Sequence, residues 1–283
     1  MGRVFVLALD GLEYDLVKKW NLKNLMQKSF GKIKLRKEYC IKSKPSWAEG
    51  TPEEVVPYTP IVWASFITGL PPQKHKIKTI WTYGKILDRI RKLPLIRHIK
   101  GKRKLLYKIG LGPRVVNKRD LNARTIFDVV KPSIDVYVPT YSDNTELHRR
   151  LSKALSISLK EYEKEIWKVH RLRERKVFEN LHREWKLFMA YFDIADLMGH
   201  LHIAKRPQRL RRVYKRLDML TFKIKKQTPE DTVFIVVSDH GMKPEPDGTG
   251  NHSDHAFYSL NIETDWKPSD ITDFYHKIIE WCS

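Results

Sequence analysis

Three apolar segments, far apart in the chain, each end in an aspartate. They are residues 4–9, 187–192 and 232–238, followed by Asp10, by Asp193 with Asp196, and by Asp239. Their length and β-branched content are typical of strands that are buried on both faces of a sheet. Helical patterns between them predict an α/β domain, in which helices cover both faces of a mostly parallel sheet. Ligands bind beyond the carboxyl ends of such strands, so the three acids are expected along one functional rim.

The other expected elements alternate along the chain. We expect helices at about 12–28, 125–130, 146–184, 208–226 and 269–282, and further strands at 32–36 and 134–138. One break is expected within 146–184. The apolar residues at helical spacing in this region are predicted core contacts, namely Leu147, Leu151, Leu155, Leu159, Tyr162, Ile166 and Val169. Residues 39–58 contain three prolines and predict a loop. With 283 residues, 41% of them hydrophobic, the chain is long enough for a single domain over 1–283.

Residues 74–122 differ in composition from the remainder. Between 74 and 120 there are sixteen Lys or Arg and two Asp, with apolar residues interleaved. This pattern predicts a basic cap or lid inserted into the domain. Contact with nucleic acid or with an acidic membrane surface is the alternative.

The whole chain is basic, with 54 Lys and Arg against 33 Asp and Glu and a net charge of +21. This excess favours anionic partners such as nucleotides, nucleic acid or acidic membranes. The alternative is a heat-tolerant, thermophile-like surface. Two cysteines without a C-x-x-C pattern favour a reduced, cytoplasmic setting. No apolar run approaches a membrane span, and the apolar run near the N-terminus is too short for a signal peptide.

Thr59 and Pro60 begin a short apolar segment that stops at Gly69. A hydroxyl residue at the N-cap, then proline, predicts the start of a helix, and the glycine predicts its end. The Thr59 hydroxyl either only caps this helix or is a nucleophile in the positive field of the helix N-terminus. A threonine hydroxyl does not ionise unaided near neutral pH. The second interpretation therefore requires a base or a metal beside it.

Histidines accompany two of the strand-ending acids. Asp196 and His200 are four residues apart, so they would face the same way on a helical turn. His240 directly follows Asp239 on a turn made sharp by a glycine. Further histidines follow in a glycine-rich loop, namely His252 and His255. Mixed Asp and His ligands suit zinc, with manganese or iron as alternatives.

Charge balance favours two metal ions. Carboxylates crowded on one rim would repel one another and raise their pKa values, which a divalent cation prevents. The four positive charges of two divalent ions would match the carboxylates of Asp10, Asp196 and Asp239 together with a Thr59 alkoxide. A phosphoryl oxygen would then bridge ions about 4 Å apart, as in two-metal phosphoryl-transfer sites.

Five short pieces of the sequence match one family in order. They are residues 7–11, residues 59–69 with Pro72 and His75, residues 196–200, residues 238–242 and residues 250–253. On these pieces the chain resembles the alkaline phosphatase superfamily, and most closely its type I phosphodiesterase/nucleotide pyrophosphatase branch. The resemblance implies the superfamily's α/β fold and hydrolysis of phosphodiester or pyrophosphate bonds.

The resemblance also implies a two-zinc site. The ligands implied for one ion are Asp196, His200 and His252, and those for the other are Asp10, Thr59, Asp239 and His240. Thr59 would attack phosphorus in line and form a phosphothreonine, which a water activated by the first metal would hydrolyse. His252 is preferred to His255, the fallback, because the family's glycine-x-histidine pattern falls there.

The sequence departs from the family near the predicted cap. Lys76 replaces the glycine of the Pro-x-x-His-Gly turn, and residues 79–81 lack the asparagine that holds a phosphate oxygen in the eukaryotic enzymes. A phosphomonoesterase or phosphotransferase of the same superfamily is therefore an alternative. A basic protein that binds nucleic acid or anionic membranes, with a vestigial metal site, is another. A sulfatase is disfavoured because it needs a cysteine or serine where Thr59 stands.

Overall fold

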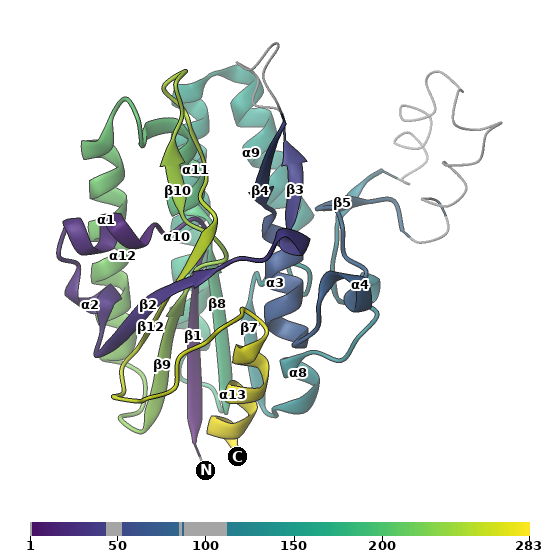
Figure 1. Cartoon of the computed structure of the whole chain (residues 1–283), viewed down its shortest axis with the longest axis vertical. Coiled ribbons are helices and arrows are strands. Elements are labelled where there is room, and N and C mark those ends of the chain that lie inside the picture. Colours follow the sequence, from purple (N-terminus) through teal and green to yellow (C-terminus); the bar gives the residue numbers. More distant parts are fainter. Residues whose placement is uncertain (1, 44–52, 85–86, 88–111) are drawn as a thin grey trace.

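The computed structural model describes residues 2–43, 53–84, 87 and 112–283. A six-stranded sheet forms the centre, in the order β2-β12-β9-β1-β8-β7 (Figure 1). The strands are β1 (Arg3–Leu9), β2 (Ser29–Lys34), β7 (Ser133–Val136), β8 (Leu187–Phe192), β9 (Thr232–Val237) and β12 (His255–Leu260). Strands β7, β8, β1 and β9 are parallel neighbours, whereas β12 is antiparallel to both β9 and β2. The predicted mostly parallel sheet is confirmed.

Helices cover both faces of this sheet, as the alternation of side chains along β1 requires. Val4, Val6 and Ala8 belong to the core that packs against one helical layer. That layer consists of α3 (Thr59–Thr68), α8 (Ile126–Val129) and α13 (Asp273–Cys282). The intervening β1 residues belong to the core on the opposite face. The helices there are α1 (Tyr14–Lys19), α2 (Lys23–Met26), α9 (Thr145–Ile157), α10 (Leu159–Asn180), α11 (Ile194–His202) and α12 (Pro207–Lys225).

Short strand pairs surround the carboxyl end of the sheet. The pairs are β3 (Cys40–Ser43) with β4 (Glu54–Pro57), β5 (Trp81–Thr82) with β6 (Arg114–Val115), and β10 (Met242–Pro244) with β11 (Gly250–His252). The chain also forms α4 (Pro72–His75) and two 3-10 turns, Lys37–Tyr39 and Lys118–Asp120. The expectation of a plain loop over 39–58 is wrong, because β3 and β4 pair across the proline-rich stretch.

The predicted basic insertion is only partly described. Its two ends meet where β5 pairs with β6 in an antiparallel manner. Residues 85–86 and 88–111 lie outside the described residues. A cap role for 74–122, and a single domain over 1–283, therefore stay predictions.

Two expected helices are broken, each for a local reason. Asn21 adopts a left-handed φ of 50° and separates α1 from α2, where one helix was expected. Ser158 ends α9 and caps α10, and its Oγ accepts the N–H of Glu161 at 3.1 Å. Leu155 and Leu159 lie on either side of this break and are 48% and 59% exposed, so their predicted core role is wrong. In the described part of the chain, none of the helices has the length and apolar content needed to cross a lipid bilayer.

Candidate active site

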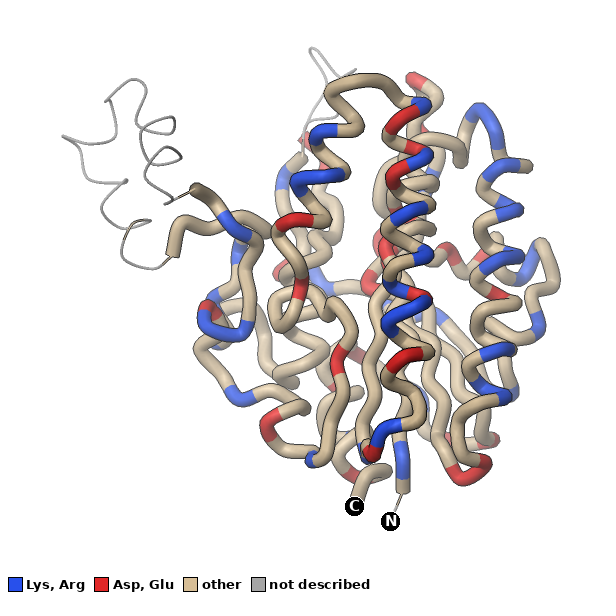
Figure 2. Tube along the Cα trace, turned by 180° about the vertical axis from the view of Figure 1, so that it is seen from behind, with Lys and Arg blue, Asp and Glu red and all other residues tan. Residues whose placement is uncertain are grey.

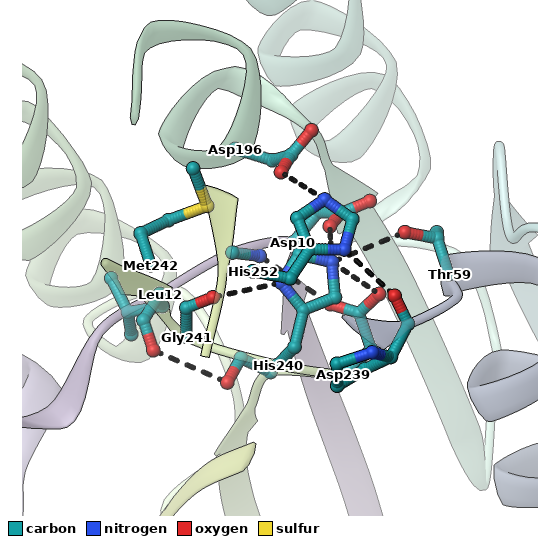
Figure 3. A network of polar contacts seen from close by, with 12 residues as sticks. Asp10, Leu12, Thr59, Asp196, Asp239, His240, Gly241, Met242 and His252 are labelled. Atoms are coloured by element: carbon teal, nitrogen blue, oxygen red, sulfur yellow. Dashed lines mark hydrogen bonds and ion pairs between the residues drawn. The ribbon is translucent and has the colours of Figure 1, made fainter. Parts of the chain in front are cut away.

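Three acids gather at the carboxyl end of the central strands (Figure 3). Asp10 directly follows β1, and Asp239 lies two residues beyond β9. Asp196 lies in the first turn of α11, just after β8. Because these strands are adjacent and parallel, their ends bring the three carboxylates to one rim. All three side chains are buried.

Close packing at this rim requires glycine directly after Asp10. Gly11 has a φ of +66°, a conformation that other residues rarely adopt. A Cβ atom at this position would lie 2.6 Å from the Cα atom of Asp196. The glycine therefore allows the turn after β1 to lie directly against α11.

A first group of ligand atoms surrounds the carboxylate of Asp196. Its Oδ1 atom lies 3.3 Å from Nε2 of His200 and 3.4 Å from Nε2 of His252. The two imidazole nitrogens are 3.2 Å apart. The structure thus brings together the three residues expected to hold one ion.

A second group surrounds Nε2 of His240. This nitrogen lies 3.2 Å from Oγ1 of Thr59, 3.3 Å from Oδ1 of Asp10 and 3.4 Å from Oδ2 of Asp239. The rings of His240 and His252 stack with their centroids 3.6 Å apart, so the two groups adjoin. The residues expected for the second ion are therefore also together, although their role as ligands stays a prediction.

Each histidine of the two groups is oriented by a backbone carbonyl. Nδ1 of His200 donates to Gly250 O at 2.7 Å, Nδ1 of His252 to Pro57 O at 2.8 Å, and Nδ1 of His240 to Gly241 O at 3.0 Å. In a neutral imidazole this leaves the Nε2 lone pair free and facing the acids. Metal-binding histidines are typically held in this way.

The carboxylates contain oxygen atoms that lack hydrogen bonds. Among the described residues, Oδ1 of Asp10, Oδ1 of Asp196 and Oδ2 of Asp239 are buried and accept none. Burial and the negative charge of Asp10 raise the pKa of Asp239 well above its ordinary value. Burial also disfavours the charged form of Asp196, but His200 and His252 lower its pKa well below the ordinary range. Three unsatisfied buried oxygens facing imidazole nitrogens fit divalent cations.

Thr59 is placed differently from the simplest expectation. The N-cap of α3 is Tyr58, and Thr59 is the first helical residue, so the expected capping role of Thr59 is wrong. Its hydroxyl contacts His240 at the helix N-terminus. Pro60 in the first turn and the left-handed Gly69 at the end agree with the predicted bounds.

Two residues near the site have partners other than the cluster. Asp193 accepts a hydrogen bond from the buried guanidinium of Arg173 at 2.9 Å. Nε2 of His255 contacts Oε1 of Glu13 at 2.9 Å. His252 rather than His255 therefore lies in the cluster.

Two supporting residues, Tyr191 and Glu13, were not predicted from the sequence. The Tyr191 hydroxyl, within the apolar run of β8, donates to Oδ2 of Asp10. Glu13 accepts from the backbone N–H of Met242 at 3.0 Å and from Oγ of Ser253 at 2.9 Å. Glu13 thus ties the turn after β1 to the loops that carry His240 and His252. A glutamate two residues after an Asp-Gly turn could have drawn attention only as a second acid near Asp10.

The chain belongs to the type I phosphodiesterase/nucleotide pyrophosphatase family, whose model matches residues 4–277. Among solved structures it is similar to murine ectonucleotide pyrophosphatase/phosphodiesterase 5, at 13% identity and a TM-score of 0.47 over 87% of this chain. An inactive variant of that murine protein in complex with AMP matches at 12% identity and a TM-score of 0.44, also over 87% of this chain. The chain spans 59% of either murine chain. No curated protein sequence matches it.

Proposed function

We propose that this protein hydrolyses phosphodiester or pyrophosphate bonds in small, nucleotide-like anionic substrates. The observation that carries the proposal is the convergence of three unsatisfied carboxylate oxygens and three imidazole Nε2 atoms beside the hydroxyl of Thr59. Membership of the family supports it. The positive charge of the chain suits a phosphate-bearing substrate.

The clusters would hold two divalent ions, with zinc favoured and manganese or iron as alternatives. The proposed ligands are Asp196, His200 and His252 for one ion, and Asp10, Thr59, Asp239 and His240 for the other. Such ions, when bound, supply positive charge that favours an ionised hydroxyl and stabilises charge on phosphoryl oxygens. The carbonyl-anchored imidazoles and the burial of the acids keep these ligands in place.

The proposed reaction proceeds in two displacements at phosphorus. Oγ1 of Thr59 forms a bond to phosphorus while the bond to the leaving alkoxide or phosphate breaks, and the proton lost by the hydroxyl ends on the leaving group. The product is a phosphothreonine. A water molecule then attacks phosphorus, the Oγ1–P bond breaks, and the threonine hydroxyl is restored. Thr59 begins α3, and the dipole of the helix favours negative charge at this end.

Turnover of bis-p-nitrophenyl phosphate tests this proposal. We expect Thr59→Ala to lower kcat by on the order of 10³-fold or more, as removal of a covalent nucleophile does in other enzymes. Thr59→Ser keeps the hydroxyl and is the matched control, expected to retain measurable turnover. Equal turnover by wild type and Thr59→Ala would remove Thr59 from the mechanism. Faster turnover of p-nitrophenyl phosphate than of the diester would favour the monoesterase alternative.

A second candidate function is binding to an acidic membrane surface. Residues 205–226, which include α12, contain ten Lys or Arg and one Asp. Figure 2 shows these cations along the helix at the right of the view. Met219 and Phe222 are exposed on α12 by 47% and 39%. Basic side chains beside exposed apolar ones are typical of a helix that lies on anionic lipid.

Vesicle sedimentation tests the second candidate. We expect salt-sensitive binding to phosphatidylserine vesicles that weakens in the double variant Arg212→Glu, Lys215→Glu. A matched control changes Lys18 and Lys19, two exposed cations of α1, to Glu. Binding that is equal in both variants would contradict a role for α12. Binding to DNA but not to vesicles would favour nucleic acid instead.

A further inference from the structure

A narrow cavity lies beside Thr59, and its function is not explained by the metal-binding groups. Thr59, Thr140, Asp143, His148 and Tyr191 provide its polar lining, with apolar residues completing the wall. Its volume is about 20 Å³. A space of this size accepts roughly one water-sized group. The cavity therefore suits a single oxygen atom and not a nucleobase.

Thr140 brings an unsatisfied hydroxyl to this cavity. The residue is 1% exposed, and its Oγ1 has no hydrogen-bond partner among the residues that the structure describes. Its φ is +62°, which is rare for a β-branched residue. A strained backbone and an unpaired buried hydroxyl both lower stability, and such features gather at functional sites.

His148 brings a second donor to the same cavity. Its Nε2 atom is bonded to Oδ2 of Asp143 at 2.6 Å, and within the described part of the chain its Nδ1 makes no hydrogen bond. Burial opposes the charged form, but Asp143 outweighs this effect and raises the pKa of His148. The cationic form carries a proton on Nδ1 as well. The Trp81 ring packs edge-on against the imidazole at 5.9 Å and holds its orientation.

The negative charge of Asp143 in the cavity wall is balanced by neighbouring cations. The carboxylate of Asp143 is paired with His148 and lies in the positive field of Arg173. The same guanidinium bonds to Asp193. Two carboxylates therefore face one guanidinium and one imidazolium. This balance allows a negatively charged oxygen to approach the cavity.

We propose that the Thr140 hydroxyl and Nδ1–H of His148 hold one non-bridging oxygen of the phosphoryl group that reacts with Thr59. The proposal rests on the proposed hydrolase function. This contact would take the place of the asparagine that residues 79–81 lack. Thr140 and His148 line the same cavity as Thr59, so an oxygen on phosphorus bound to Oγ1 of Thr59 can enter it.

Substitution of Thr140 separates this role from a structural one. Thr140→Gly removes the hydroxyl and relieves the left-handed strain, so we expect an unchanged or higher Tm together with a kcat lower by about 10²-fold. Thr140→Ser keeps the hydroxyl and should retain most of the activity. His148→Asn should lower kcat while the metal content stays unchanged. Wild-type kcat in Thr140→Gly would overturn the proposal, and so would a fall in Tm that accounts for the lost activity.

A chiral phosphorothioate diester tests the position of the oxygen directly. Sulfur is larger than oxygen, so the isomer that directs sulfur into the cavity should react more slowly with the wild type. Thr140→Gly enlarges the cavity and should reduce this preference between isomers. An unchanged preference would contradict oxygen binding there. If Thr59→Ala is inactive while Thr140→Gly and His148→Asn behave as wild type, only this inference fails. Full activity of Thr59→Ala would instead remove the proposed function itself.

Discussion

The hydroxyl Oγ1 of Thr59 lies 3.2 Å from Nε2 of His240, although 181 positions separate them in the sequence. One residue begins α3, and the other follows β9 on the turn toward β10. Oδ1 of Asp10 lies 3.3 Å from the same nitrogen. The N-terminus of a buried helix and two strand ends thus meet at one point. This meeting brings an imidazole and carboxylates, the ligand types that bind divalent cations, to a hydroxyl that does not ionise unaided.

Asp193 and Asp196 are expected to respond differently to the same substitution. Asp193→Asn weakens the buried pair with Arg173 and should lower the free energy of unfolding by about 3–5 kcal/mol, while metal binding persists in the folded protein. Asp196→Asn should lose a bound ion and destabilise the metal-free protein less. Urea unfolding in the presence of a chelator measures the stability of each metal-free variant. The metal content per chain measures how many ions each variant binds. Loss of an ion in Asp193→Asn, together with the larger loss of stability in Asp196→Asn, would contradict these assignments.

Glu13 is expected to hold the loops that carry His240 and His252 in place. Glu13→Ala leaves the Met242 N–H and the Ser253 hydroxyl without their buried acceptor, which should cost about 2–4 kcal/mol of unfolding free energy. Metal affinity should fall by roughly 10–100-fold, because the loops carrying His240 and His252 lose an anchor. Isothermal titration with zinc measures the second effect. Ser253→Ala removes a single bond and should cost about 1 kcal/mol. Unchanged zinc affinity in Glu13→Ala would show that the loops need no such support.

His75 is expected to make the fold sensitive to acid. The side chain is fully buried, its Nδ1 accepts from Ile77 N at 3.1 Å, and its Nε2 donates to Oγ of Ser65 at 3.0 Å. Burial lowers its pKa from 6.5 to about 4. Between these values the unfolded chain binds more protons than the folded one. The contribution is therefore fully present above pH 6.5 and is lost as the pH falls toward 4.

The dependence of urea unfolding on pH measures this effect. The amide of His75→Gln is uncharged throughout this range, so we expect the stability of the variant to fall less steeply than that of wild type between pH 6.5 and 4. The difference in slope should correspond to the uptake of up to about one proton on unfolding. His170, whose pKa burial lowers to about 3, titrates in the same range and leaves a residual slope in both proteins. Identical slopes in wild type and His75→Gln would show that His75 protonates equally well in the folded state.

The positions of Asp10 and Asp239 could be predicted because buried parallel strands constrain where their next residues lie. The same rule applied to Asp193, yet a buried Arg173 from α10 pairs with it, and no local pattern announces such a long-range partner. Strand β12 was not predicted, since its pattern follows directly on the histidine-rich loop. Family motifs, more than periodicity, brought Thr59 and His252 into one prediction.

Thr140 and His148 show where inference from sequence stops. Neither residue belongs to a motif, and each becomes notable only through its surroundings in the fold. The hydroxyl of Thr140 stands out because no described residue bonds to it, and His148 because Asp143 lies against it. Both residues gain their interest from lining one cavity with Thr59. Charge patterning likewise could not assign the role of 74–122 or α12.

Native mass spectrometry tests the central claim most directly, because it counts ions per folded chain. After dialysis of chelator-treated protein against zinc, we predict two ions bound per chain, and one after Asp196→Asn. Removal of the ions should abolish turnover of the diester, and returning zinc should restore it. A wild-type chain that stays folded yet binds no zinc, manganese or iron would contradict the account.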